Sequence, residues 1–296
     1  MDKNYLTSAQ MAEKWGVSER SVRNYCNAGR VEGAVLIGKI WNIPEDAEKP
    51  QRLNKKADNS LLAILKEEKK SQRKGGIYHK IQIELTYNSN HIEGSKLTHD
   101  QTRYIYETNT LGVSNDIVNV DDVIETANHF RCIDKIIDCA NYDISESLIK
   151  ELHLILKSGT ADSRKDWFAV GDYKKLPNEV GGRDTAQPED VKNEIKALIE
   201  SYNKIESKSF KDIIAFHVAF ERIHPFQDGN GRVGRLLMFK ECLRYNIVPF
   251  IIDDDLKLFY YRGLNEWSSE KGYLIDTCLT AQDKFKNYLD YFRIQY

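Results

Sequence analysis

The stretch HPFQDGNGRVGR, residues 224–235, holds one histidine, one acid, three glycines and two arginines within twelve positions. Apolar residues three and four apart predict a helix before it, in FKDIIAFHVAFERI, and another after it, in VGRLLMFKECLRY. A glycine-rich turn between two helices exposes backbone N–H groups at the start of the second helix, where anions bind. The stretch therefore predicts a phosphate site at a junction of helices.

Five residues of this loop are candidates for binding a polyphosphate. The backbone of Gly229, Asn230 and Gly231 would cradle the anion, and glycine permits the close approach that this requires. Arg232 and Arg235 fall on the first turns of the second helix and can reach the same anion. A plain glycine-rich turn with a helix cap is the alternative, and the clustered charges make it the weaker interpretation.

Two further residues add reactive groups to the predicted loop. Histidine is the side chain best suited to exchanging a proton near neutral pH, so His224 is the expected general base. A single carboxylate beside phosphates commonly holds Mg²⁺, so Asp228 is the expected metal ligand. Phe226 is expected to fill the core, and His217 to be a buried, hydrogen-bonded histidine, because no zinc-like ligand spacing accompanies it.

The composition indicates a globular protein with one large and one small domain: 296 residues, 41% apolar and 30% charged. A net charge of −2 excludes a polybasic surface along the whole chain. No apolar run approaches the ~20 residues of a membrane helix, so no membrane partner is expected. The N-terminus lacks the apolar core of a signal peptide and the five cysteines include no CxxC pair, which indicates reduced thiols and a cytoplasmic protein.

Residues 1–50 predict a small domain of their own. SAQMAEKWG and SERSVRNYCNAG predict two short helices joined by a tight turn, and AVLIGKIWNIPEDA predicts a two-stranded ribbon around Gly38. The stretch YLTSAQMAEKWGVSERSVRNYCNAGRVEGAVLIGKIWNIP resembles the winged helix-turn-helix of the MerR and excisionase families.

That resemblance implies DNA contacts from three residues of the second helix, Arg20, Arg23 and Asn24. The acidic and basic residues of this segment balance, however, whereas phosphate binding depends on an excess of positive charge. DNA binding and docking to a protein therefore both stay open. A homo-oligomer would strengthen weak DNA binding.

Residues 51–58 are polar and predict a linker, and residues 59–296 are dominated by helical periodicity. FAVGDYKKLPNEVGGRDTAQ, residues 168–187, contains too many glycines for a helix and predicts an irregular hairpin. The expected fold class is therefore mainly α with one small β-hairpin, plus the N-terminal winged helix-turn-helix.

The loop also matches the Fic signature, His-x-Phe-x-Asp/Glu-Gly-Asn-Gly-Arg-x-x-Arg, at every specified position. Residues 60–290 resemble a Fic domain in their helical pattern and in the hairpin, which is similar to the family's flap. Most Fic proteins transfer AMP from ATP to a Ser, Thr or Tyr hydroxyl of a target protein. The resemblance therefore implies a protein adenylyltransferase with ATP as substrate and Mg²⁺ as cofactor.

The resemblance also assigns roles within the loop. His224 would be the catalytic base and Asp228 the Mg²⁺ ligand, while the two arginines would support the distal phosphates. The implied ATP-binding residues of the loop are Gly229, Asn230, Gly231, Arg232, Val233, Gly234 and Arg235.

Two other segments gain roles from the resemblance. The flap would flank the nucleotide and pair with the target chain as an added strand, through Val180, Gly181, Gly182 and Arg183. FYYRGLNEW resembles the adenine-side helix of Fic proteins, which places Tyr260 and Tyr261 near the base, with plain core packing as the alternative. Many relatives have an asparagine about two turns later, where this chain has Ser268.

SNHIEG, residues 89–94, ends a predicted helix and matches the inhibitory pattern Ser/Thr-x-x-x-Glu-Gly/Asn of self-restrained Fic proteins. The resemblance implies that Ser89 and Glu93 form a brake, in which Glu93 pairs with Arg235 and takes that arginine from the γ-phosphate. The alternative is a glutamate that faces water beside a glycine cap.

Three functions follow from these features. An autoinhibited adenylyltransferase that modifies a target protein or itself is preferred, because the motif is whole. The alternatives are a nucleotide-sensing, DNA-binding regulator and a de-AMPylase in which Glu93 orients water. The sequence leaves the target protein and the balance of forward and reverse reaction open.

Overall fold

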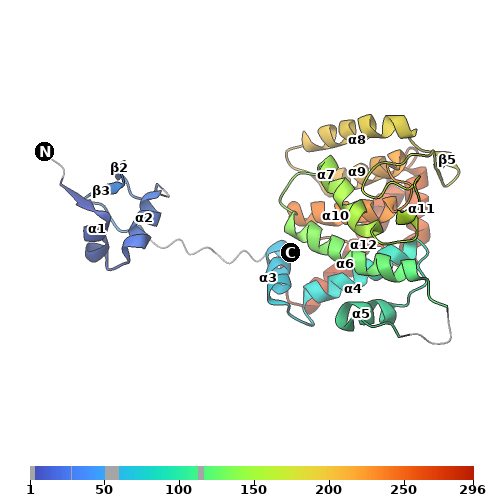
Figure 1. Cartoon of the computed structure of the whole chain (residues 1–296), viewed down its shortest axis with the longest axis horizontal. Helices are drawn as coiled ribbons and strands as arrows, with labels where there is room; N and C mark the ends of the chain where they lie inside the picture. The colour runs from blue at the N-terminus through green and yellow to red at the C-terminus, as the bar shows by residue number, and fades with distance from the viewer. Residues whose placement is uncertain (1–3, 28, 51–59, 113–116) are drawn as a thin grey trace. The chain divides into compact units, whose positions relative to one another are not determined.

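A computed structural model describes residues 4–27, 29–50, 60–112 and 117–296 (Figure 1). The chain divides into two compact units, residues 1–58 and 59–296, and each has its own cluster of buried apolar side chains. Within the described ranges, no helix combines the length and the apolar character that crossing a membrane demands.

The first unit is a three-stranded antiparallel sheet, ordered β1-β3-β2, with two helices. Its elements are β1 (Tyr5–Thr7), α1 (Ser8–Trp15), α2 (Glu19–Asn27), β2 (Val35–Ile37) and β3 (Ile40–Pro44). Thr7 caps α1 by accepting a hydrogen bond from the Gln10 N–H, and Gly16 ends the helix at φ 63°. The predicted helices and ribbon are present, and β1 is an addition. The winged helix-turn-helix assignment stays a prediction.

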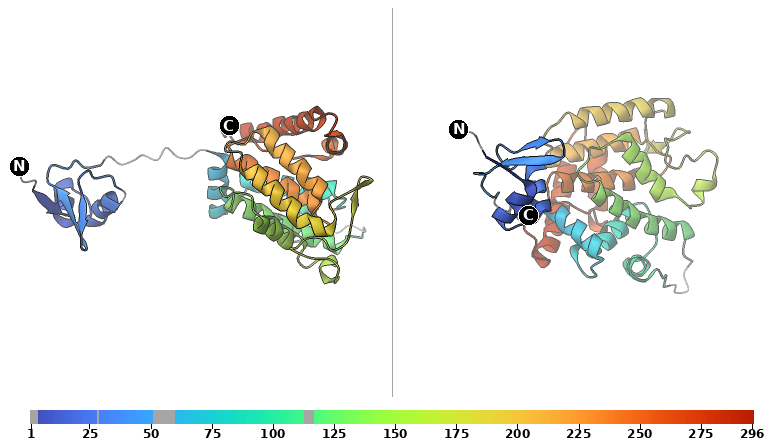
Figure 2. Two further views of the ribbon diagram at one scale, coloured as in Figure 1. Left: turned by 90° about the horizontal axis from the view of Figure 1, so that it is seen from above. Right: turned by 60° about the vertical axis from the view of Figure 1, so that its left-hand side comes forward.

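The second unit is mainly helical with one small hairpin, which confirms the predicted fold class for this part of the chain. Figure 2 shows the hairpin extending from the body of packed helices. The elements are α3 (Leu61–Ser71), α4 (Ile77–Ile92), α5 (His99–Thr108), α6 (Val120–Asp138), α7 (Glu146–Lys157), η1 (Asp162–Arg164), β4 (Glu179–Val180), β5 (Arg183–Asp184), α8 (Pro188–Asn203), α9 (Phe210–Ile223), α10 (Asn230–Arg244), η2 (Asp254–Leu256), α11 (Lys257–Glu266) and α12 (Gly272–Tyr291).

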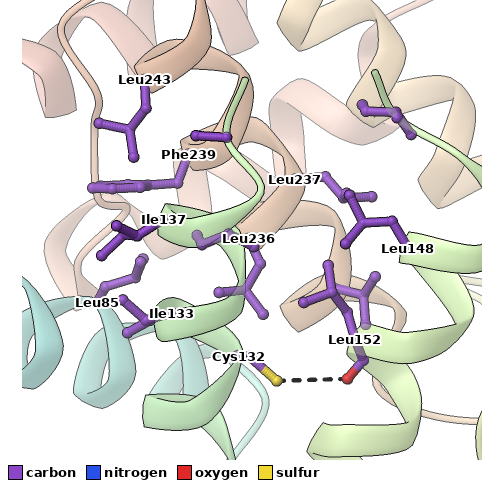
Figure 3. Packing of buried hydrophobic residues seen from close by; sticks show 14 of the residues in the cluster. Leu85, Cys132, Ile133, Ile137, Leu148, Leu152, Leu236, Leu237, Phe239 and Leu243 are labelled. Atoms are coloured by element: carbon purple, nitrogen blue, oxygen red, sulfur yellow. Dashed lines mark hydrogen bonds between the residues drawn. The ribbon is translucent and has the colours of Figure 1, made fainter. Parts of the chain in front are cut away.

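Helix α10 lies at the centre of this unit. It packs against α3, α4, α6, α7 and α9, and its residues are buried from the first turn almost to the last. Figure 3 shows Leu236, Leu237 and Phe239 of α10 among apolar side chains of α4, α6 and α7. A helix that is buried on every side is held firmly in place. Its N-terminus, where the loop ends, therefore occupies a fixed position.

Candidate active site

The loop between α9 and α10 is closed by its own side chains. Helix α9 ends at His224, whose backbone is left-handed at φ 51°, and Gly229 begins α10 at φ 84°. The Asn230 side chain accepts a hydrogen bond from the Phe226 N–H and donates one to the Phe226 carbonyl, both at 2.8 Å. The amide of Asn230 therefore fixes the loop, and its backbone rather than its side chain remains for a ligand.

A cavity of about 600 Å³ lies at this loop, a size typical of small-molecule sites. It brings together the loop, the hairpin, the end of α4 and one face of α11. The predicted site residues that line it are Glu93, Val180, Gly181, Arg183, His224, Asp228, Gly229, Asn230, Gly231, Arg235, Tyr260 and Tyr261.

Three loop residues predicted to bind ATP do not line this cavity. Arg232 is buried and held by Glu125 and Asp228, and Val233 is fully buried in the apolar core. Gly234 faces His217, whose Nδ1 would lie only 2.7 Å from a Cβ at this position. Successive helical side chains point about 100° apart, so Gly231 and Arg235, four residues apart, share the face toward the cavity.

Of the predicted ATP-binding segment 229–235, Gly229, Asn230, Gly231 and Arg235 line the cavity, and the contact of the other three residues with ATP stays a prediction. In the hairpin, Gly182 is likewise outside the lining, whereas its neighbour Gly181 belongs to it.

His224 is set up as a base. Its Nδ1 lies 3.3 Å from the backbone carbonyl oxygen of Glu221, which can only accept, so Nδ1 carries the hydrogen and Nε2 keeps its lone pair. Burial lowers the pKa of His224 to about 4, although the hydrogen bond to Glu221 acts in the opposite direction. The imidazole is therefore neutral at pH 7 and can accept a proton.

Arg235 is held by the end of α4. Its Nη2 lies 2.7 Å from Glu93 Oε1 and donates to the Ser89 carbonyl at 2.9 Å, and its Nε donates to the Ser89 hydroxyl at 3.0 Å. Burial would lower the pKa of Arg235, but Glu93, together with Tyr260 and Glu221, raises it. A Cβ at Gly231 would meet Glu93 and lie 2.9 Å from Arg235 Nη1, so only glycine leaves room for this ion pair.

Two cations outside the cavity, Lys157 and Arg232, hold the Asp228 carboxylate, and neither contact was predicted from the sequence. Oδ2 of Asp228 lies 2.7 Å from Lys157 Nζ and 3.1 Å from Arg232 Nη2. Burial would raise the pKa of Asp228, but Arg232 and Lys157 keep it well below its usual value. Asp228 is therefore ionised in the folded protein at neutral pH.

The single carboxylate of Asp228 fits the way in which proteins hold magnesium. Within the described part of the chain, no three His, Cys, Asp or Glu side chains form a cluster that could hold a metal ion. Magnesium takes one or two carboxylates and completes its shell with water and phosphate oxygens. A lone ionised carboxylate at the edge of the cavity fits that pattern.

The hairpin is a tight turn anchored to the loop. Gly181 and Gly182 have φ of 58° and 72°, the left-handed values that a two-residue hairpin turn requires. Asn178 donates to the Phe226 carbonyl at 3.1 Å, and the buried Lys174 ammonium donates to Asn178 at 2.7 Å. Burial lowers the pKa of Lys174 to about 8. These anchors, which the sequence did not reveal, fix the hairpin at the mouth of the cavity.

On α11, one polar residue replaces the expected one. Asn265 lines the cavity and its side chain approaches Gly181, whereas Ser268 accepts a hydrogen bond from Arg222 at 2.8 Å. Tyr261 lines the cavity and donates to the Ile92 carbonyl at 3.1 Å. The cavity therefore has an asparagine, Asn265, one turn closer to the tyrosines than Ser268.

Tyr260 lines the same cavity from a largely buried position. Its hydroxyl lies 2.6 Å from Nε2 of His217, which is itself fully buried. The structure thus confirms His217 as a buried, hydrogen-bonded histidine, and Phe226 is fully buried as expected.

The residues predicted to contact DNA lie in the first unit, on α2. Arg20, Arg23 and Asn24 are exposed, as a binding helix requires. The Arg23 guanidinium is paired with Glu19 at 2.6 Å, which reduces the positive charge of this face. DNA binding stays a prediction.

The fold and loop define a known class of protein. Residues 143–242 match the model of the Fic/DOC family, so the chain contains a Fic domain. The Fic-domain signaling protein from Bacteroides thetaiotaomicron has a similar structure, with a TM-score of 0.58 and 27% identity over 79% of this chain and 92% of that one. Fic-1 from C. elegans shares the fold, with a TM-score of 0.59 and 20% identity over 77% of this chain and 69% of that one.

Curated relatives carry the name protein adenylyltransferase Fic. The Drosophila mojavensis protein is 29% identical over 186 residues, which is 60% of this chain and 35% of that protein. The Nematostella vectensis protein is 27% identical over 183 residues, which is 61% of this chain and 42% of that protein. The matched segment thus spans well under half the length of either relative.

Proposed function

We propose that this chain is a protein adenylyltransferase that moves AMP from ATP to a hydroxyl group of a protein. The observation that carries the proposal is the position of one neutral imidazole, His224, in the same cavity as Gly229, Asn230 and Gly231 at the N-terminus of α10. Arg235 faces the same cavity from one turn further along the helix. A base, an anion site and a fixed cation are the groups that transfer of a nucleotidyl unit needs.

In the proposed reaction, a target hydroxyl attacks the α-phosphorus of ATP. A new bond forms between the hydroxyl oxygen and phosphorus, the α–β anhydride bond breaks, and pyrophosphate leaves. The hydroxyl proton passes to Nε2 of His224, the ring nitrogen that keeps its lone pair. The backbone of Gly229 and Gly231 would hold phosphate oxygens at the helix N-terminus.

Asp228 would hold magnesium in this site. When bound, the ion would neutralise phosphate charge and hold the triphosphate in place. Two side chains, Arg232 and Lys157, keep Asp228 ionised. Neither of these cations lines the cavity.

We also infer that Glu93 restrains this activity. Its carboxylate occupies Arg235, which would otherwise bind a distal phosphate, and places a negative charge where that phosphate would lie. Breaking such a buried pair costs about 3–5 kcal/mol, enough to hold a resting state. Binding of ATP in the reactive orientation therefore requires Glu93 to leave Arg235.

The test is transfer of label from α-³²P-ATP with Mg²⁺, to the chain itself and to candidate target proteins. We expect Glu93→Gly to raise labelling at least tenfold over the unchanged chain, and His224→Ala to abolish it. The double variant should behave like His224→Ala, because loss of the base is not rescued by loss of the brake. Mass spectrometry should find one adenylate on a hydroxyl side chain.

Two outcomes would contradict this proposal. Equal labelling by the unchanged chain and Glu93→Gly would remove the brake. Labelling that persists in His224→Ala would remove the base and with it the proposed reaction. Release of AMP from a labelled protein by the unchanged chain, and not by Glu93→Gly, would assign Glu93 to the reverse reaction instead.

A further inference from the structure

We propose that Lys157 and Glu125, which lie outside the loop, are positioning residues that orient Asp228 for binding the magnesium–nucleotide complex. The inference rests on the proposed function, because it concerns how the same site takes its metal. Neither residue lines the cavity, and both act through Asp228.

The four charged side chains form a closed ring. Lys157 and Arg232 each contact both Glu125 and Asp228, so each cation bridges the same two carboxylates. Lys157 and Arg232 are almost fully buried, with 3% and 5% of their side chains exposed, whereas Asp228 is 44% exposed. The ring thus carries two positive and two negative charges, and only its Asp228 corner opens toward the cavity.

Helix α7 holds the backbone of Asp228 as well as its carboxylate. His153 and Lys157 are four residues apart on one face of α7. The Gly171 N–H donates to His153 Nδ1 at 2.9 Å, so the ring hydrogen is on Nε2, which donates to the Asp228 carbonyl at 3.2 Å. The His153 ring is also stacked on Phe226 at 3.9 Å. Asp228 is therefore fixed at two points by a single helix.

Glu125 keeps Lys157 in place. One oxygen of its carboxylate contacts the Lys157 ammonium, and the other contacts the Arg232 guanidinium. Because both cations reach the same oxygen of Asp228, Oδ2, they fix how the carboxylate is turned. Partners that orient a metal-binding carboxylate commonly change metal affinity 10–100-fold when they are removed.

The experiment measures how much Mg²⁺ the chain needs to bind a non-hydrolysable ATP analogue, by calorimetry in the Glu93→Gly chain so that the brake is absent. We expect Lys157→Met to raise the half-saturating Mg²⁺ concentration about 10–100-fold. Binding of the analogue without Mg²⁺ should change about twofold or less, because Lys157 does not line the cavity.

Lys135→Met is the matched control. Lys135 also bridges α6 and α7, through Glu151 at 2.6 Å, but this pair is partly exposed and neither residue lines the cavity. The control variant should need as much Mg²⁺ as its parent.

A double variant separates positioning from folding. Glu125→Gln with Lys157→Met removes one negative and one positive charge, so the net charge is unchanged and Asp228 stays paired with Arg232. We expect its midpoint of thermal unfolding to lie closer to that of the parent than the midpoint of Lys157→Met does. Its requirement for Mg²⁺ should nevertheless stay raised, because Asp228 still lacks one of its two orienting partners.

Each result has one interpretation. A folded double variant with the Mg²⁺ requirement of its parent would overturn the role of Lys157 and leave the proposed function intact. Failure of the parent chain to bind the analogue at any Mg²⁺ concentration would refute the proposed function, and this role of Lys157 with it.

Discussion

Gly231 and Gly234 lie one turn apart on α10, and each faces charged or polar side chains at short range. The first makes room for the pair of Glu93 and Arg235, and the second for His217 and Glu221. Glycine is a poor helix former, so its presence twice in four residues of a buried helix has a steric reason here.

Alanine at position 234 should destabilise the protein. Its Cβ would lie 2.7 Å from His217 Nδ1 and 2.9 Å from Glu221 Oε1, which forces both side chains to move. Overpacking costs about 1–3 kcal/mol and the helix preference of alanine returns about 1 kcal/mol, so we expect a net loss of about 1 kcal/mol. Urea unfolding of Gly234→Ala measures it.

Gly112→Ala is the control for this substitution, because its nearest neighbour, Tyr104, would lie at an ordinary 3.7 Å. Its free energy of unfolding should not fall. A Gly234→Ala chain as stable as the unchanged one would mean that the His217 and Glu221 side chains have room to spare.

At the scale of elements, Arg235 is held by Ser89 of α4 and by Glu93, the residue that follows this helix. Three hydrogen bonds join them: two reach Ser89, at its hydroxyl and its carbonyl, and one reaches Glu93. Only the hydroxyl bond is lost in Ser89→Ala, because the backbone carbonyl and the Glu93 carboxylate stay.

Ser89→Ala should therefore release the proposed brake partially. A hydrogen bond to a charged group contributes about 1.5–3 kcal/mol, which is less than the loss of the carboxylate itself. We expect labelling with α-³²P-ATP to rise several-fold above the unchanged chain and to stay below that of Glu93→Gly. Labelling equal to or above that of Glu93→Gly would assign the restraint to the serine.

Most helices of the second unit were predictable because helical periodicity is a local property of the chain. Helix α5, for example, has a local mark at its start, the capping box of Thr98 and Gln101. The contacts of Lys157 and Glu125 had no such local mark. Lys157 lies 71 residues from Asp228 in the sequence, and Glu125 lies 107 residues from Arg232. Only the packing of α6, α7 and α10 brings these side chains together.

The chemistry of the loop could be predicted because its residues lie close together in the sequence. His224, Asp228 and Arg235 stand within twelve residues, so one short pattern shows their chemistry. Only four of the residues from 229 to 235 line the cavity, because a buried helix turns most of its side chains away from its own N-terminal site.

At the scale of the whole molecule, several buried histidines make stability depend on pH. His129, His153 and His217 are fully buried, and burial lowers the pKa of each to about 3, while that of His224 falls to about 4. The unfolded chain binds protons at these residues near pH 6.5, so it takes up more protons than the folded chain as pH falls.

We therefore expect the free energy of unfolding to fall between pH 7 and pH 5, by about 2 kcal/mol for each such histidine. Glu221 opposes this, because burial and the Glu93 charge raise its pKa to about 8 and its proton stabilises the folded state at lower pH. Four histidines outweigh one carboxyl, so the net change is a loss. Urea unfolding at the two pH values measures it, and constant stability would contradict it.

The left-handed backbone of His224 bears on how the protein could be made more heat-resistant. A side chain at φ 51° costs about 1–2 kcal/mol that glycine would not. A library screened for survival of heating alone should accordingly enrich glycine at position 224, which would remove the proposed base. Such a screen should also select for catalytic activity, because the left-handed backbone at position 224 favours glycine for stability whereas the proposed reaction needs histidine.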